Sequence, residues 1–169
     1  MIKFVVVATR FGWVGVGGSE GGLVLLTLPK SSRKAALSEI KELAADAGED
    51  TSAFSDLPNR LQRYFNGEKI LFTDRLDLSS ATTFQRAVWN ATLSIPYGET
   101  RTYAWVAQQI GKPRALRAVG RALARNQFPI IVPCHRVIAS DGNLGGFSGG
   151  LVLKKRLLGL ESGRLGDLS

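Results

Sequence analysis

The sequence predicts an α+β protein, with a small α/β N-terminal domain followed by a mainly helical C-terminal domain. Two β-rich runs near the start precede amphipathic stretches, whereas the second half shows helical patterns almost throughout. Charge divides the chain in the same way: residues 1–79 carry ten basic and ten acidic residues, and residues 80–169 carry twelve basic and four acidic ones. A polar stretch over 73–82 marks the boundary, so we expect domains at 1–78 and 79–169.

The N-terminal half predicts two strands and two helices. We expect strands at 4–9 and 23–28, separated by a glycine-rich turn that runs through Gly15, Gly17, Gly18, Gly21 and Gly22. Ser31 or Ser32 can cap a helix that continues to about residue 47 and ends at Gly48. A second helix is predicted over 56–66, and residues 70–72 are a candidate for a further strand.

The C-terminal half predicts three helices before residue 126. The first begins at Thr82 or Thr83 and ends before Pro96-Tyr97-Gly98. Thr102 can cap a short helix over 103–110, and Pro113 suits the first turn of a helix over 114–125. Two short helices joined by a tight turn that contains glycine are typical of a helix-turn-helix.

The predicted helix over 114–125 carries an arginine edge. Arginines recur there at intervals of three and four residues, which aligns Arg114, Arg117, Arg121 and Arg125. Leu116, Val119 and Leu123 form a separate apolar stripe, expected to pack in the core, and alanines and Gly120 keep the rest slim. No acid lies between Glu99 and Asp141, whereas a merely solvated face normally mixes both signs. The pattern favours a polyanion such as nucleic acid as partner.

The single cysteine, Cys134, directly precedes the single histidine, His135. A lone cysteine among apolar residues is commonly a small core residue. A thiolate is also the strongest side-chain nucleophile, and a neighbouring imidazole or cation lowers the pKa of a thiol. Arg136 beside the pair and the basic helix upstream favour the nucleophile.

Composition excludes several classes of protein and site. One cysteine excludes an internal disulfide, and one cysteine with one histidine excludes a zinc site made from these ligands, so we expect no metal. No apolar run reaches 18 residues and the N-terminal run is too short for a signal peptide, so we expect no membrane association. A free thiol fits a reducing compartment, and we expect the cytoplasm.

The segment Pro133-Cys134-His135-Arg136-Val137, with Asn126 before it and Gly146-Phe147-Ser148-Gly149-Gly150 after it, resembles the active-site signature of the methylated-DNA–protein-cysteine methyltransferases. Residues 84–89, 95–99 and 117–120 resemble the same family in order and spacing. The resemblance is strong over about 82–161 and only architectural over 1–80.

The resemblance implies an RNase H-like N-terminal domain and a winged-helix or helix-turn-helix C-terminal domain. It also implies a monomer that needs no cofactor and repairs O6-methylguanine, and less well O4-methylthymine, in double-stranded DNA. The alkyl group would pass once to the protein, since nothing in the chain regenerates the acceptor. The DNA would be bound in its minor groove, with the target nucleotide flipped out.

Site residues follow from the same resemblance. Cys134 would accept the alkyl group, His135 would act through a water as its base, and Glu161 would polarise the histidine. Asn126 would hold the turn after the recognition helix, and Tyr103 would press on the target phosphate and donate a proton towards the guanine. Arg117 would fill the gap left by the flipped nucleotide, while Val137 and Ser148 would contact the guanine. We expect the further DNA contacts at Arg114, Gly120, Arg121, Arg125 and Arg136.

Two other functions compete with this interpretation. A non-catalytic binder of damaged DNA would share the fold but lack the acceptor, and Cys134 argues against it. A sequence-specific regulator would carry base-reading side chains on its recognition helix, where alanine and glycine predominate here. A cysteine protease is disfavoured because its base usually comes from a separate segment of the chain.

Overall fold

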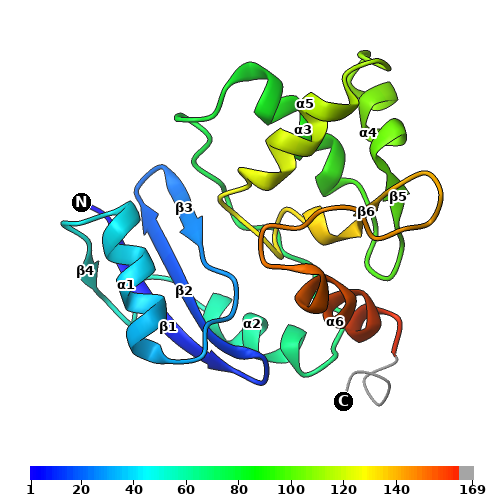
Figure 1. The fold of residues 1–169 in the computed structure, drawn as a ribbon. Coiled ribbons are helices and arrows are strands. Elements are labelled where there is room, and N and C mark those ends of the chain that lie inside the picture. The colour runs from blue at the N-terminus through cyan, green and yellow to red at the C-terminus, as the bar shows by residue number, and fades with distance from the viewer. Residues whose placement is uncertain (164–169) are drawn as a thin grey trace. The chain divides into compact units, whose positions relative to one another are not determined.

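The computed structural model describes residues 1–163 and divides into two structural units. The first unit is built around a four-stranded sheet (Figure 1). This unit comprises Met1–Ser79. Its strands are β1 (Lys3–Thr9), β2 (Gly12–Ser19), β3 (Gly22–Leu26) and β4 (Gly48–Glu49), in the order β3-β2-β1-β4. The first three form an antiparallel meander, and β4 pairs in parallel with β1.

Gly15, Gly17 and Gly18 of the expected turn lie in strand β2, because they make room for neighbours, and the turn itself is confined to the residues around Gly21. A Cβ at Gly15 would lie 2.6 Å from the Ile40 side chain of the helix that packs on β2, and one at Gly17 would lie 2.9 Å from Leu25. The chain turns instead at the ends of this strand, where Gly12 and Gly22 have positive φ angles of 127° and 121°. Helix and sheet therefore approach closely at this face.

Two helices complete the first unit, α1 (Arg33–Leu43) and α2 (Leu57–Phe65). The Ser32 hydroxyl accepts a hydrogen bond from the Ala35 amide, which confirms the predicted cap. Helix α1 ends earlier than expected, because Gly48 belongs to β4 and residues 44–47 lead into that strand. The strand expected over 70–72 is absent, and Leu71 in that segment is exposed.

The second unit begins at Ser80. The predicted second domain runs to residue 169, and residues 164–169 lie outside the described part. The elements in chain order are α3 (Thr83–Leu93), β5 (Arg101–Thr102), α4 (Tyr103–Gln109), α5 (Leu116–Ala124), the 3-10 turn η1 (Cys134–Arg136), β6 (Val137–Ile138) and α6 (Leu151–Glu161). Strands β5 and β6 pair in parallel.

Helices α3, α4 and α5 pack against one another (Figure 1), and Trp89 of α3 is buried. The Trp89 indole N–H donates to the Ala122 carbonyl at 2.9 Å, which ties α3 to α5. A capping box between Thr82 and Gln85 starts α3, and the Thr102 hydroxyl caps α4, so both predicted helix starts are confirmed. These contacts present α5 to solvent on one side.

Helix α5 is shorter than the sequence predicts. Arg114 lies in the turn before it and Arg125 is its C-terminal cap residue, so only Arg117 and Arg121 stand within the helix. Val119 and Leu123 are buried as expected, but Leu116 is 44 % exposed, because it occupies the first turn, where no element covers it.

Within residues 1–163, no helix combines the length and the apolar character needed to cross a membrane.

Candidate active site

Cys134 opens the 3-10 turn η1 at the end of a tightly folded segment. Its backbone N–H donates to the Val132 carbonyl at 2.8 Å, and the Arg136 N–H donates to the Pro133 carbonyl at 2.9 Å. Pro133 fixes the backbone on the approach, since its ring restricts φ. Cys134 is 6 % exposed and lines a pocket.

Asn126 braces the loop between α5 and the cysteine. Its side-chain N–H donates to the Val132 carbonyl at 2.8 Å, and its side-chain oxygen accepts from the Phe128 N–H at 2.9 Å. The two bonds close the loop on itself and connect the end of α5 with the segment that holds Cys134. The position of the thiol is thereby coupled to that of α5.

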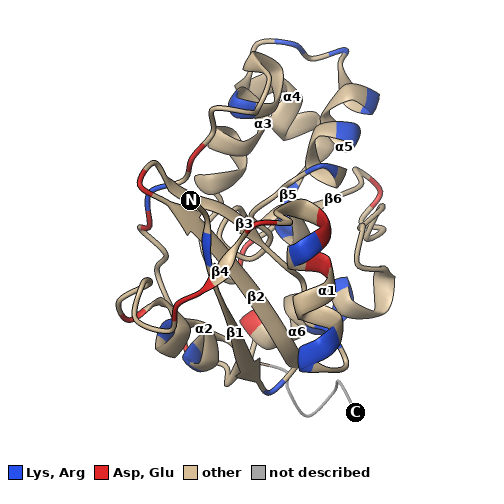
Figure 2. Ribbon diagram, turned by 90° about the vertical axis from the view of Figure 1, so that its left-hand side faces the viewer, with Lys and Arg blue, Asp and Glu red and all other residues tan. Residues whose placement is uncertain are grey.

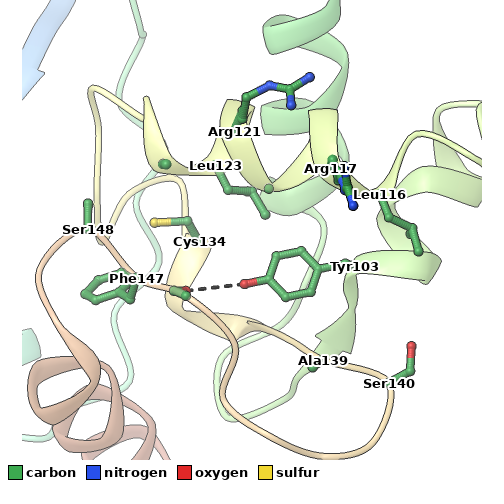
Figure 3. A pocket seen from close by; sticks show the side chains of 13 residues that line it. Tyr103, Leu116, Arg117, Arg121, Leu123, Cys134, Ala139, Ser140, Phe147 and Ser148 are labelled. Carbon is green, nitrogen blue, oxygen red and sulfur yellow. Dashed lines mark hydrogen bonds between the residues drawn. The ribbon is translucent and has the colours of Figure 1, made fainter.

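A pocket of about 870 Å³ lies between α5, Tyr103 of α4 and residues 139–148 (Figure 3). Cys134 points into it from below α5, and Phe147 and Ser148 border it on the side of the loop. The sequence-predicted residues that the structure brings together here are Tyr103, Arg117, Gly120, Arg121, Cys134 and Ser148. The pocket therefore joins the thiol to the exposed side of α5.

A buried ion-pair network lies behind the cysteine. His135 Nε2 lies 2.6 Å from Glu161 Oε2, and both side chains are buried. The Arg136 guanidinium donates to the same carboxylate, from Nε to Oε1 at 2.7 Å and from Nη2 to Oε2 at 3.1 Å. Glu161, at the end of α6, is therefore in direct contact with the histidine that follows Cys134.

The charges of this network favour a carboxylate and a neutral imidazole. Burial alone would raise the pKa of Glu161, but His135 and Arg136 outweigh it and lower that pKa to about 2. Burial lowers the pKa of His135, although the hydrogen bond to Glu161 opposes this shift. A neutral imidazole that donates Nε2–H to a carboxylate keeps its Nδ1 lone pair for a proton.

The resting thiol is protonated, contrary to the expectation of a lowered pKa. Burial raises the pKa of Cys134 above its ordinary value, and the Asn126 amide and the positive charge of Lys154 offset only part of this effect. The adjacent imidazole does not activate the thiol by its charge, because it is itself neutral. The thiol must therefore lose its proton during the reaction.

Lys154 of α6 ties together the loop that borders the pocket. Its ammonium group donates to the carbonyl oxygens of Val137 at 2.6 Å and Gly146 at 3.2 Å, and also to that of Leu144. Burial lowers the pKa of Lys154 to about 8. The sequence analysis missed this residue, because a lysine within the basic run 154–156 carries no local sign of burial.

Tyr103 reaches the same loop from α4. Its hydroxyl donates to the Gly146 carbonyl at 3.3 Å, and its ring lies 5.9 Å from the Lys154 ammonium group. A Cβ at Gly145, where φ is 71°, would lie 2.7 Å from the tyrosine oxygen, so glycine is required there. The hydroxyl stands at the pocket wall, where it can meet a bound base.

The exposed side of α5 is basic (Figure 2), and it includes a glycine that adds no side chain to the surface. Arg114, Arg117, Arg121 and Arg125 are all exposed, and Arg114 and Arg125 lie outside the pocket lining. A Cβ at Gly120 would meet no atom within 4 Å, so packing within the protein does not require this helical glycine. Glycine in a helix costs about 1 kcal/mol relative to alanine, which suggests that its small size serves an external partner.

Two expected DNA contacts are wrong in this structure. Arg136 is 8 % exposed, with its guanidinium held by Glu161 and by the Ile95 carbonyl. The Val137 side chain is fully buried and does not line the pocket. Arg136 ends the η1 turn and Val137 begins β6, two and three residues after the cysteine, and the turn directs both inward.

Within residues 1–163, no three His, Cys, Asp or Glu side chains gather as a metal site would require.

Known proteins of one family match this chain. The family described as 6-O-methylguanine DNA methyltransferase, DNA binding domain, matches residues 83–163. The methylated-DNA–protein-cysteine methyltransferase of Methanosarcina barkeri is 42 % identical over 160 residues, which cover 95 % of this chain and 97 % of the relative. The chain belongs to the methylated-DNA–protein-cysteine methyltransferases. The Mycobacterium tuberculosis protein of that name is 52 % identical over 115 residues, 68 % of this chain and 69 % of the relative.

Solved structures agree with this assignment. OGT of Mycobacterium tuberculosis in complex with DNA superimposes with a TM-score of 0.81 at 41 % identity, over 96 % of this chain and 94 % of that one. O6-methylguanine-DNA methyltransferase from the hyperthermophilic archaeon Pyrococcus kodakaraensis gives 0.71 at 26 % identity, over 95 % and 99 %. This methyltransferase is therefore a DNA-binding repair enzyme of mixed α/β fold that transfers an alkyl group from DNA to a cysteine.

Proposed function

We propose that this methyltransferase repairs O6-methylguanine in duplex DNA by moving the methyl group onto Cys134, once per molecule. The observation that carries the proposal is the position of the only cysteine, which opens into the pocket under α5 with the His135–Glu161 pair directly behind it. A thioether is not reversed by thiol exchange, and no second thiol is present to accept the group. The reaction is therefore stoichiometric.

The transfer is a displacement at carbon. The Cys134 proton passes, through a water, to Nδ1 of the neutral His135, and Glu161 stabilises the imidazolium that forms. The sulfur forms a bond to the methyl carbon while the bond from that carbon to guanine O6 breaks, and the electron pair stays on the guanine. The Tyr103 hydroxyl gives the guanine a proton, and the tyrosine is reprotonated from solvent as His135 loses its own. The net products are a thioether and an unmodified guanine.

The proton transfer explains why a buried, protonated thiol can react. A thiolate with a depressed pKa is a weaker nucleophile, and a permanent thiolate would also be open to oxidation. Here the thiol keeps its proton until the target nucleobase occupies the pocket. A lesion in the pocket thus meets a strong nucleophile that is formed only at the moment of attack.

The basic side of α5 is the proposed DNA surface, placed in the minor groove. A target base must leave the stack to reach Cys134, at a cost of a few kcal/mol. Arg117 occupies the gap that the flipped nucleotide leaves, and Arg114, Arg121 and Arg125 bind phosphates. Gly120 permits close approach of the backbone, Tyr103 presses on the target phosphate, and Ser148 contacts the guanine edge.

Leu116 adds an apolar contact that the sequence analysis assigned to the core. Its side chain is 44 % exposed at the pocket, next to Arg117 and on the same helix turn (Figure 3). Apolar side chains in the minor groove pack against sugars or wedge between base steps. We place Leu116 against the DNA beside the flipped nucleotide.

The finer architecture fits the same function. We infer an RNase H-like first domain over 1–78, supported by the strand order β3-β2-β1-β4 with one parallel edge strand, and a winged-helix second domain over 79–169. The enzyme acts as a monomer. O4-methylthymine reacts by the same displacement, and less well.

Transfer of a labelled methyl group tests the proposal. Duplex DNA with radiolabelled O6-methylguanine is incubated with the protein, and the label is expected on Cys134 at one methyl group per protein molecule. Cys134→Ala is expected to bind the same duplex with unchanged affinity and to take up no label. Binding by the wild-type protein without transfer would favour a non-catalytic binder of damaged DNA, and a preference for one undamaged sequence would favour a regulator.

A further inference from the structure

Arg136 is immobilised against the carboxylate that orients the histidine. Its Nε and Nη2 bind the two oxygens of Glu161, and its Nη1 donates to the Ile95 carbonyl at 2.7 Å. The Tyr97 ring lies 5.7 Å from the guanidinium carbon. A planar guanidinium with contacts on three of its nitrogens holds one orientation, and it imposes that orientation on the carboxylate.

The Glu161 carboxylate is shared between the arginine and the histidine. Oε2 lies 3.1 Å from Arg136 Nη2 and 2.6 Å from His135 Nε2, while Oε1 accepts from Arg136 Nε and, at 3.3 Å, from the Gly98 backbone N–H. All these contacts require the charged carboxylate as acceptor. Without the arginine, the carboxylate would be free to rotate away from the imidazole.

Three charged groups act on His135 in its buried position. Glu161 favours the protonated imidazole, whereas Arg136 and Lys154 disfavour it by Coulomb repulsion, and burial also disfavours it. Tyr97 faces the Arg136–Glu161 pair and stays neutral, because burial raises its pKa. The arginine therefore both supports the carboxylate and prevents it from drawing a permanent proton onto the histidine.

We propose that Arg136 is a positioning residue of the transfer reaction, which holds the Glu161 carboxylate so that His135 keeps its proton on Nε2 and presents Nδ1 as the base. It touches neither the DNA nor the reacting atoms. Because it acts only through the transfer to Cys134, the proposal rests on the proposed function and goes beyond it by adding the residue that sets the state of the base.

Two substitutions separate the charge of Arg136 from its geometry. Arg136→Met removes both, and Arg136→Lys keeps the charge without the paired contact to the carboxylate. The matched control is Arg60→Met, because Arg60 makes a comparable two-pronged contact with Asp74 at 2.8 Å and lies 5.8 Å from the Phe72 ring, in the first unit. It reports the effect of losing such a pair where no reaction depends on it.

Single-turnover transfer is measured at several DNA concentrations and pH values. Arg136→Met is expected to lower the maximal rate at least about tenfold, which is part of the roughly 10²–10⁴-fold that a positioned acid or base contributes. The DNA concentration for half-maximal rate should stay within about twofold, since rate and binding respond separately to such a change. The maximal rate of Arg136→Lys is expected to lie between those of the wild type and Arg136→Met. Arg60→Met is expected to retain the wild-type rate.

His135 reports on the mechanism directly, because it is the only histidine and its NMR titration is unambiguous. Arg136→Met is expected to shift the pKa of His135, because removal of the repelling charge raises this pKa and displacement of the Glu161 carboxylate lowers it. The pH below which transfer is lost should shift in the same direction by the same amount. A role that is only structural would lower stability without moving either midpoint.

A double-mutant cycle with Glu161→Gln tests the route of the effect. If Arg136 acts through the carboxylate, Arg136→Lys has little further effect on the rate in the Glu161→Gln protein. If the two changes multiply instead, Arg136 acts independently and the proposal is overturned. The same holds if folded Arg136→Met shows the wild-type rate and pH profile.

The remaining outcomes are also decisive. If Arg136→Met does not fold, Arg136→Lys carries the rate comparison and the cycle. The NMR titration of His135 in the wild-type protein then tests the protonation state of the base. A midpoint at or above about 6.5, the ordinary value, would contradict a neutral His135. A wild-type protein that transfers no methyl group would overturn the proposed function, whereas normal transfer by both Arg136 variants would overturn only this inference.

Discussion

The Lys154 ammonium group lies 2.6 Å from the Val137 carbonyl, and from this position it also reaches the loop that borders the pocket. A single side chain of α6 thus connects the strand after the cysteine turn with the Gly146 carbonyl, which accepts from Tyr103 as well. The loop, the proposed proton donor and the cysteine turn are held in one arrangement by this contact.

We predict that Lys154→Met slows transfer without a large loss of stability. Burial lowers the pKa of Lys154 to about 8, so the charged form is disfavoured in the folded state and its removal offsets the lost hydrogen bonds. The loop around Gly146 would lose the contact that fixes its position. A displacement near 1 Å at a reacting group lowers the rate about 100-fold. Single-turnover transfer and thermal unfolding measure the two effects.

The neighbouring exposed lysine supplies the control for this experiment. Lys155→Met removes the same charge from the same helix and is expected to leave both measurements unchanged. A full transfer rate in Lys154→Met would show that the loop needs no such support.

We predict that the free enzyme reacts slowly with thiol reagents at neutral pH. Burial raises the pKa of Cys134, so the thiolate is scarce until the pH exceeds the ordinary thiol value of about 8.5. The rate of alkylation by iodoacetamide, followed against pH, gives the midpoint without ambiguity because the chain has one cysteine. A midpoint near neutrality would mean that the resting cysteine is a thiolate.

Local sequence patterns predicted where the helices begin and drew attention to the segment around Cys134. They did not predict the buried network of His135, Arg136 and Glu161. The sequence predicts that α3 begins at Thr82 or Thr83, and the structure forms a capping box between Thr82 and Gln85 at this point. The partner of a buried arginine depends on which distant segment folds over it. Arg136 and Glu161 are 25 residues apart, and no periodicity connects them.

The same limit explains the errors at Leu116 and Lys154. Leu116, Val119 and Leu123 share one helical spacing, yet burial of the first depends on whether another element covers the end of α5. Lys154 is buried because carbonyl oxygens of an irregular loop converge on it, and an irregular loop leaves no pattern in the sequence. Glu161 was identified only through the family resemblance, since an acid at a helix end is otherwise ordinary.

We predict that Arg117→Ala impairs repair of duplex DNA more than reaction with the free base. Arg117 is proposed to offset the cost of flipping, and a free base needs no flipping. The loss on duplex is expected to be about tenfold or more, against a loss below about twofold on free O6-methylguanine. Arg10→Ala, an exposed arginine of the first unit, is the control. An equal loss on both substrates would contradict insertion into the duplex.

We predict that Leu116→Ala weakens duplex binding while stability is maintained. The half-exposed side chain gains little from folding, but its burial against DNA is worth about 1 kcal/mol, or about fivefold in affinity. Binding to an undamaged and a lesion-bearing duplex is measured by titration. Leu93→Ala, at the end of α3 and 39 % exposed, is the control. Unchanged affinity in Leu116→Ala would remove this residue from the DNA surface.

We predict that Glu161 makes the fold sensitive to acid. Its pKa is about 2 in the folded protein, against an ordinary value of about 4.5, so its stabilising effect is present above pH 4.5 and is lost as the pH falls towards 2. A shift of this size corresponds to about 3 kcal/mol of unfolding free energy. The lowered pKa of His135 also makes the folded protein less stable as the pH falls, in the range from about 6.5 down to the pKa that His135 has in the folded protein.

The comparison with Glu161→Gln isolates the carboxylate. The variant is less stable at pH 7, because His135 and Arg136 then face a neutral amide, but it has no carboxyl to protonate at this position. The difference in unfolding free energy between wild type and variant, measured with urea at a series of pH values, should therefore shrink by about 3 kcal/mol from pH 4.5 to pH 2. A difference that stays constant over this range would mean that Glu161 is not held as a carboxylate by its buried partners.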